Sequence, residues 1–168
     1  FIDIDSFIDF FIINELTKNI DGYRLSTYLH KDLSGKLKMG PIWDFNLAFG
    51  NADYCQGYSA TGWGYKFNSI CPGDVWQVPF WWDRLMESEY FKNKLKNRWV
   101  ELRQVKLSNI TINNLIDSHV KYLSNNDVIN ENFINWPIIG KWIWPNSFIG
   151  NTHDEEITYL KQWIDRRL

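Results

Sequence analysis

The feature that most constrains the fold is an apolar helical pattern near the start of the chain that runs straight into a hairpin pattern. Large apolar side chains recur at three- and four-residue spacing from Phe7, which predicts a helix over about residues 5–18. The segment NIDGY ends that helix, and residues 23–44 then alternate and turn as a β-hairpin does, around DLSGK. Pro41 restricts the second strand to an edge or an end. A helix followed by a hairpin predicts an α+β fold.

The rest of the chain predicts mostly helices. Residues 50–79 are rich in glycine and aromatic side chains and show no clear period, which indicates a long irregular excursion. The helices expected after it are a short one around Trp81 to Leu85, one over about 88–104, one capped by Ser108 or Thr111, a shorter one over 127–135, and a final one that begins with the capping-box pair Thr152 and Glu155. We expect a mostly helical α+β chain forming one domain or part of one over residues 1–168.

Charge and hydropathy exclude two classes of partner. Eighteen basic and twenty acidic residues give a net charge of -2, and no Lys/Arg cluster stands out, so a nucleic-acid-binding surface is not expected. No apolar run reaches the roughly 18 residues of a membrane span. The chain begins at Phe1 without an initiator Met, so we expect it to be cut from a longer protein.

The two cysteines leave the cellular compartment open. Cys55 and Cys71 lack CxxC spacing, which argues against a metal site. They form a disulfide if the protein is exported and remain buried or free thiols if it is not.

Two carboxylates flank the predicted hairpin, and they are the strongest candidates for chemistry. Asp21 precedes the hairpin and Asp44 follows it, so the hairpin brings both to one end of a small sheet. Phosphoryl transfer needs one carboxylate to accept the proton of the attacking hydroxyl and another to hold the Mg²⁺ that bridges the nucleotide phosphates. The alternative is structural: Asp21 with Gly22 as a helix-ending turn, and Asp44 as an N-cap or Asx turn.

Residues 14–50 resemble the CotH (spore-coat protein H) kinase family, whose signature runs from an NE helix through N-x-D-G to a hairpin ending in WDFD-x-x-FG. The matching residues are Asn14, Glu15, Asn19, Asp21, Gly22, Trp43, Asp44, Phe45, Phe49 and Gly50. An RW-x-x-LR stretch at residues 98–103 and a terminal LKQWIDRR helix extend the resemblance over most of the chain. It implies an atypical, secreted or surface-associated kinase that uses Mg·ATP to phosphorylate Ser or Thr of a protein acceptor, with a fold like the large lobe of a kinase.

The resemblance also implies roles for individual residues. Asp21 matches the catalytic-loop Asp and Asp44 the metal-binding Asp. Asn46 takes the second acidic position of WDFD, which leaves a neutral oxygen for the metal. Ser26 stands where kinases commonly place a metal-binding Asn, and together with Asn19 is assigned to cofactor binding. Asn19 either orients Asp21 or caps the preceding helix.

Three expectations depend on what the resemblance leaves open. No residue before Phe1 supplies the nucleotide-clamping Lys and glycine-rich lid of an N-terminal lobe, so the fragment alone is expected to be inactive. An active kinase is the first functional interpretation. The residues at Ser26 and Asn46 keep a second one open, an inactive kinase relative that acts as a surface or assembly protein. The third reading is a carbohydrate-binding module, because ten Trp are present and Tyr58, Trp63, Tyr65, Trp142 and Trp144 have polar neighbours suited to sugars. In a kinase, by contrast, Trp63 and Tyr65 belong at the rim of the cleft that holds the two carboxylates.

Overall fold

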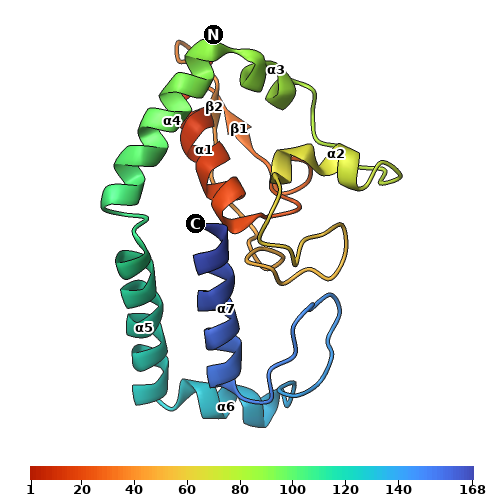
Figure 1. Cartoon of the computed structure of the whole chain (residues 1–168), viewed down its shortest axis with the longest axis vertical. Helices are drawn as coiled ribbons and strands as arrows, with labels where there is room; N and C mark the ends of the chain where they lie inside the picture. Colours follow the sequence, from red (N-terminus) through yellow and green to blue (C-terminus); the bar gives the residue numbers. More distant parts are fainter.

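The computed structural model describes residues 1–168 and has an α+β, mostly helical fold, as expected (Figure 1). Its elements are α1 (Ile4–Thr17), β1 (Leu29–His30), β2 (Lys38–Met39), the 3₁₀-helix η1 (Gly64–Lys66), α2 (Phe67–Ile70), α3 (Trp81–Glu87), α4 (Glu89–Gln104), α5 (Asn109–Asn125), α6 (Val128–Asn135) and α7 (His153–Arg167). Each helix expected from the sequence is present. None of the helices has the length and apolar character needed to cross a membrane.

Helix α1 is the centre of the core. Nine of its fourteen residues are buried, because apolar side chains occupy more than one face. Phe10 stacks on Trp82 of α3 and Phe11 meets Phe91 of α4 edge to face, with ring centroids 5.8 and 6.4 Å apart. Asp3 is the N-cap, accepting from the Ser6 amide at 3.1 Å. The helix therefore begins one residue earlier than predicted.

The hairpin is confirmed, but its strands are short. Leu29 pairs with Met39 and His30 with Lys38, while residues 21–26 form a tight turn instead of a strand. Pro41 has no N–H to continue the ladder, so β2 ends before it. The expected alternation therefore contributes only four paired residues, and the connections on either side of the hairpin carry the candidate site.

Helices α5 and α7 form the lower half of the molecule, side by side and joined through α6 (Figure 1). Ser108 caps α5, accepting from the Thr111 amide at 3.1 Å. No residue of α5 is fully buried, so its apolar stripe is less enclosed than a core stripe. Ion pairs and hydrogen bonds between side chains link the two helices; for example, Lys161 Nζ of α7 donates to Asp117 Oδ1 of α5 at 2.5 Å.

The excursion over residues 50–79 contains η1 and α2, which the sequence did not predict, and one covalent link. Cys55 and Cys71 form a disulfide with Cα atoms 5.7 Å apart, so they are not free thiols. The bond joins two positions within the excursion that are 16 residues apart in the sequence.

Candidate active site

Asn19 joins the two ends of the hairpin. This side chain is fully buried; its Oδ1 accepts from the Asp21 amide at 3.2 Å, and its Nδ2 donates to the Asp44 carbonyl at 3.1 Å. One amide group thus fixes the backbone of both candidate carboxylates. Of the two roles open for Asn19, the contacts are those of an orienting residue.

The Asp21 turn is held by its own backbone. The Asp21 carbonyl accepts from the amides of Arg24, Leu25 and Ser26 at 3.0 to 3.2 Å. Gly22 lies directly against α1, where an added Cβ would be 1.9 Å from Asn14 Oδ1, so no larger residue fits. The glycine of the D-G pair is therefore a steric requirement of packing the turn onto the helix.

Asp44 is exposed and adopts a left-handed backbone conformation, with φ of 63°. Non-glycine residues rarely adopt this conformation, and it concentrates at functional sites. The Ser26 hydroxyl donates to Asp44 Oδ2 at 3.3 Å, so Ser26 joins the turn after Asp21 to the end of the hairpin. Four of the five predicted site residues, Asn19, Asp21, Ser26 and Asp44, thus form one connected group.

Arg24 is the nearest cation to Asp21. Its Nη2 lies 2.8 Å from Asp21 Oδ1, and its side chain is only 3% exposed. Burial raises the pKa of Asp21, the Arg24 guanidinium opposes this rise, and the charges of Asp44 and Asp74 add to it. Ser26 links the two carboxylate-bearing segments, because its amide donates to the Asp21 carbonyl and its hydroxyl to Asp44 Oδ2.

Tyr54 and Asp74 bring the excursion to this site. Burial first, and then the charge of Asp21, raise the pKa of the Tyr54 phenol. Asp74 Oδ1 accepts from Arg24 Nη1 at 2.9 Å. Trp63 and Tyr65 instead pack on Phe11 of α1, with ring centroids 6.2 and 5.4 Å away, so the excursion meets the candidate site through residues that the sequence did not single out.

The donor atoms around Asp44 suit a magnesium ion that also binds phosphates. No group of three or more His, Cys, Asp or Glu side chains is arranged to hold a metal. Magnesium typically takes one or two protein carboxylates and completes its shell with water and nucleotide phosphates. The carboxylate of Asp44 and the hydroxyl of Ser26, which contact each other, offer oxygen atoms of that kind. Asn46, the fifth predicted site residue, follows Asp44 by two positions and is exposed, and no side-chain contact joins it to the group.

The comparisons with known proteins bear on the whole chain. The family model described as CotH kinase protein matches residues 1–168. The chain belongs to the CotH kinase family. Neither the comparison with curated proteins nor that with solved structures gave a match. Membership of the CotH kinase family makes the chain kinase-like, while the roles of its individual residues remain predictions.

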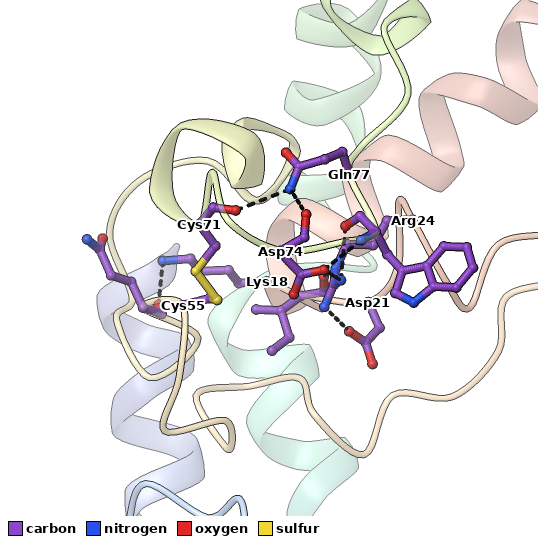
Figure 2. The surroundings of a disulfide bond; sticks show 10 residues. Lys18, Asp21, Arg24, Cys55, Cys71, Asp74 and Gln77 are labelled. Atoms are coloured by element: carbon purple, nitrogen blue, oxygen red, sulfur yellow. Dashed lines mark hydrogen bonds and ion pairs between the residues drawn. A yellow bond between two sulfur atoms is a disulfide. The ribbon is translucent and has the colours of Figure 1, made fainter.

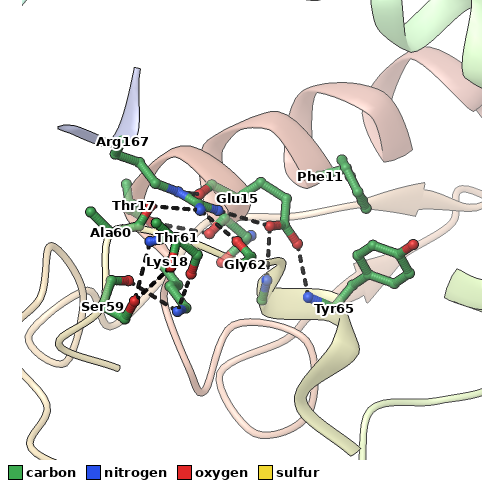
Figure 3. A network of polar contacts seen from close by, with 12 residues as sticks. Phe11, Glu15, Thr17, Lys18, Ser59, Ala60, Thr61, Gly62, Tyr65 and Arg167 are labelled. Carbon is green, nitrogen blue, oxygen red and sulfur yellow. Dashed lines mark hydrogen bonds and ion pairs between the residues drawn. The ribbon is translucent and has the colours of Figure 1, made fainter. Parts of the chain in front are cut away.

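Glu15 of the NE pair in the CotH signature has structural contacts. The Glu15 carboxylate accepts from the amides of Gly64 and Tyr65, both at 2.8 Å (Figure 3). It also accepts from the Tyr23 hydroxyl at 3.0 Å. Arg167 of α7 completes the set at 3.1 Å. Glu15 and Arg167 also line a cavity of about 440 Å³ together with apolar side chains of α1 and α4. Glu15 therefore organises the fold and does not point at the candidate site.

Sequence reasoning missed Arg24, Tyr54 and Asp74. Arg24 was detectable in principle, because an Arg three residues after an Asp in a turn is well placed to pair with it. Asp74 follows Arg24 by 50 residues and lies in a segment without periodicity, so no local pattern connects the two.

Proposed function

We propose that this chain is part of a CotH-like Ser/Thr protein kinase, which transfers the γ-phosphoryl group of Mg·ATP to a hydroxyl of a protein acceptor. The observation that carries the proposal is the Asn19 bridge, because it holds the backbones of Asp21 and Asp44 together at the ends of one hairpin. Family membership supports the reaction class.

Asp21 is the proposed general base. Its Oδ1 pairs with Arg24, and its Oδ2 makes no hydrogen bond, which leaves one oxygen to accept the proton of the acceptor hydroxyl. Its side chain is 17% exposed, enough for an acceptor to reach it.

Asp44 is the proposed metal ligand, with Ser26 and Asn46 as neutral oxygen donors and Asn19 as the residue that orients the site. Magnesium bound with the nucleotide would neutralise charge on the phosphates. The Ser26 hydroxyl contacts Asp44 Oδ2 and so restricts the rotation of this carboxylate.

Substitution of the two carboxylates tests the proposal in the full-length protein that contains this chain. Asp44→Ala and Asp21→Asn should each lower kcat for phosphotransfer by at least about 100-fold, since each removes a group required in the transition state. Asp32→Asn, an exposed carboxylate in the hairpin turn, is the matched control and should leave kcat unchanged. The readout is transfer of labelled γ-phosphate to protein Ser or Thr.

A protein without transferase activity would support the alternative reading, an inactive relative with an assembly role, for which Ser26 and Asn46 are the motivating substitutions. Full activity in the Asp44→Ala variant would remove Asp44 from the site. No contact in the structure supports the third interpretation, a carbohydrate-binding module.

We also propose that the protein is exported or lies at the cell surface. The Cys55–Cys71 disulfide supports this, because structural disulfides persist in oxidising compartments. Alkylation of the protein taken directly from its native host should label neither cysteine before reduction and both after it. Labelling of both cysteines before reduction would contradict the proposal.

A further inference from the structure

Arg24 is enclosed in a way that allows its guanidinium only one orientation. Nη2 donates to Asp21 Oδ1 at 2.8 Å, Nη1 to Asp74 Oδ1 at 2.9 Å and to the Trp76 carbonyl at 3.1 Å, and Nε to the Ile20 carbonyl at 2.9 Å. The group also lies over the Phe67 ring, 4.1 Å from its centroid. A guanidinium satisfied on all three nitrogens is a rigid support for the carboxylate it contacts.

Asp74 is itself fixed by a short loop that starts at Cys71. Its amide donates to the Cys71 carbonyl at 3.2 Å, and its carboxylate accepts from the Trp76 amide at 2.8 Å. The Gln77 side chain donates to the carbonyls of both Cys71 and Asp74, at 3.2 and 2.6 Å. The position of Asp74 therefore depends on the position of Cys71.

The disulfide connects this loop back to the end of α1. Cys71 is bonded to Cys55, and the carbonyl of the next residue, Gln56, accepts from Lys18 Nζ at 2.9 Å (Figure 2). Lys18 precedes Asp21 by three residues. The contacts thus form a closed ring from α1 through the disulfide, Asp74 and Arg24 to the candidate base.

We propose that Arg24, held by Asp74, is a positioning residue for Asp21, and that the Cys55–Cys71 disulfide keeps this support in place, so that its reduction lowers phosphotransfer. This inference rests on the proposed function. Reduction by a dithiol delivers two electrons and two protons, breaks the S–S bond to give two thiols, and oxidises the dithiol to its own disulfide. Cys71 is then free to move, and Asp74 and Arg24 move with it.

Asp74→Asn tests the support with little change of shape. Asp74 Oδ1 accepts from both Arg24 Nη1 and the Trp76 amide, so the Asn oxygen keeps the bond to Trp76 while Arg24 loses the negative charge that holds it. In the full-length protein we expect kcat to fall about tenfold, because slight misplacement of a catalytic group costs one to two orders of magnitude in rate. KM for ATP should stay within about twofold, since Arg24 contacts no nucleotide-binding residue. Asp83→Asn, which removes an exposed ion pair with Lys66 nearby, is the control and should leave both constants unchanged.

The disulfide is tested by the double variant Cys55→Ser with Cys71→Ser, and by dithiothreitol treatment of the unmutated protein. Both should lower kcat by a similar factor, and dithiothreitol should not affect the double variant. Adding Asp74→Asn to the double variant should lower kcat by much less than the product of the separate effects, because both changes act on one contact path. Independent, multiplicative effects would overturn the inference.

Amide hydrogen exchange separates this inference from the proposed function, because it needs no activity. Reduction and Asp74→Asn should each speed exchange several-fold in a peptide spanning residues 21–27, in which the amides of Arg24, Leu25 and Ser26 bond to the Asp21 carbonyl. Exchange in residues 4–17 should stay unchanged. Unchanged exchange in residues 21–27 would overturn the contact path even if Asp21→Asn abolishes activity. Faster exchange with kcat unaffected would overturn the positioning role. Loss of the proposed function would appear separately, as full activity in Asp21→Asn and Asp44→Ala.

Discussion

Asp21 shows how three neighbours set the properties of one carboxylate. Burial raises its pKa most, Arg24 lowers it, and the negative charges of Asp44 and Asp74 raise it. Because the folded-state pKa lies above the ordinary value, the protonated form is favoured by folding. The contribution of Asp21 to the free energy of unfolding is therefore present at low pH and is lost as pH rises through the folded-state pKa.

This pKa shift predicts the acidic limb of the pH–rate profile. A general base must be deprotonated, so kcat/KM of the full-length protein should fall as pH decreases through a value above the usual range for Asp. Arg24→Gln removes the cation that opposes the shift and should move the limb to higher pH. Asp74→Asn removes a charge that adds to the shift and should move it to lower pH. Profiles that coincide for all three proteins would show that Asp21 is not the titrating base.

At the scale of single elements, the final helix shows most clearly how a local pattern determines a boundary. Thr152 accepts from the Glu155 amide at 3.2 Å, and Glu155 accepts in return from the Asn151 amide at 2.8 Å. Three acidic residues in the first turn and two arginines in the last complement the helix dipole. Helix α7 is therefore specified by its own sequence.

Thr152→Ala should lower the free energy of unfolding by about 1 kcal/mol, because the Glu155 amide loses its cap. Thr158→Ala makes the same chemical change at an exposed position inside α7 and should stabilise the protein by a few tenths of a kcal/mol, since Ala is the better helix former. Urea unfolding followed by Trp fluorescence measures both. Equal effects of the two substitutions would show that the cap contributes nothing.

At the scale of the whole molecule, cations from the two ends of the fold hold the excursion in place. Lys18 Nζ donates to the carbonyls of Gln56, Ser59 and Thr61 at 2.7 to 3.0 Å, and burial lowers its pKa to about 8. Arg167 donates to the carbonyls of Ala60 and Gly62 and pairs with Glu15. The last turn of α7 thus reaches the same loop as the end of α1.

Glu15→Gln should destabilise the chain by about 3 kcal/mol or more. An uncharged amide leaves Arg167 buried without a counter-charge, and its NH₂ group faces an N–H donor where Glu15 has a second acceptor oxygen. Glu101→Gln removes an exposed partner of Arg98 and should cost less than about 1 kcal/mol. Urea unfolding measures the two losses, and similar values would contradict a central role for Glu15.

The sequence alone was enough to predict α1, helices α3 to α7 and the hairpin. Helix periods, caps and turn residues act over three to ten positions, so their physics is local and can be read along the chain. Gly22 can likewise be recognised from the local sequence as part of a D-G turn. The reason that glycine is required there, its close contact with Asn14, arises only when the turn folds back onto α1.

Only the tertiary structure decided which groups far apart in the sequence come together, in the candidate site and in the rest of the fold. Asp74 is 50 residues from Arg24 in the sequence, and Glu15 is 152 residues from Arg167. Trp144, which follows α6, stacks on Tyr54 of the excursion. Residues 50–79 have no repeating pattern, because their backbone is held by buried cations and a disulfide and not by a regular ladder. The partner of each such group is set by three-dimensional packing and burial, which leave no periodic signal in the sequence.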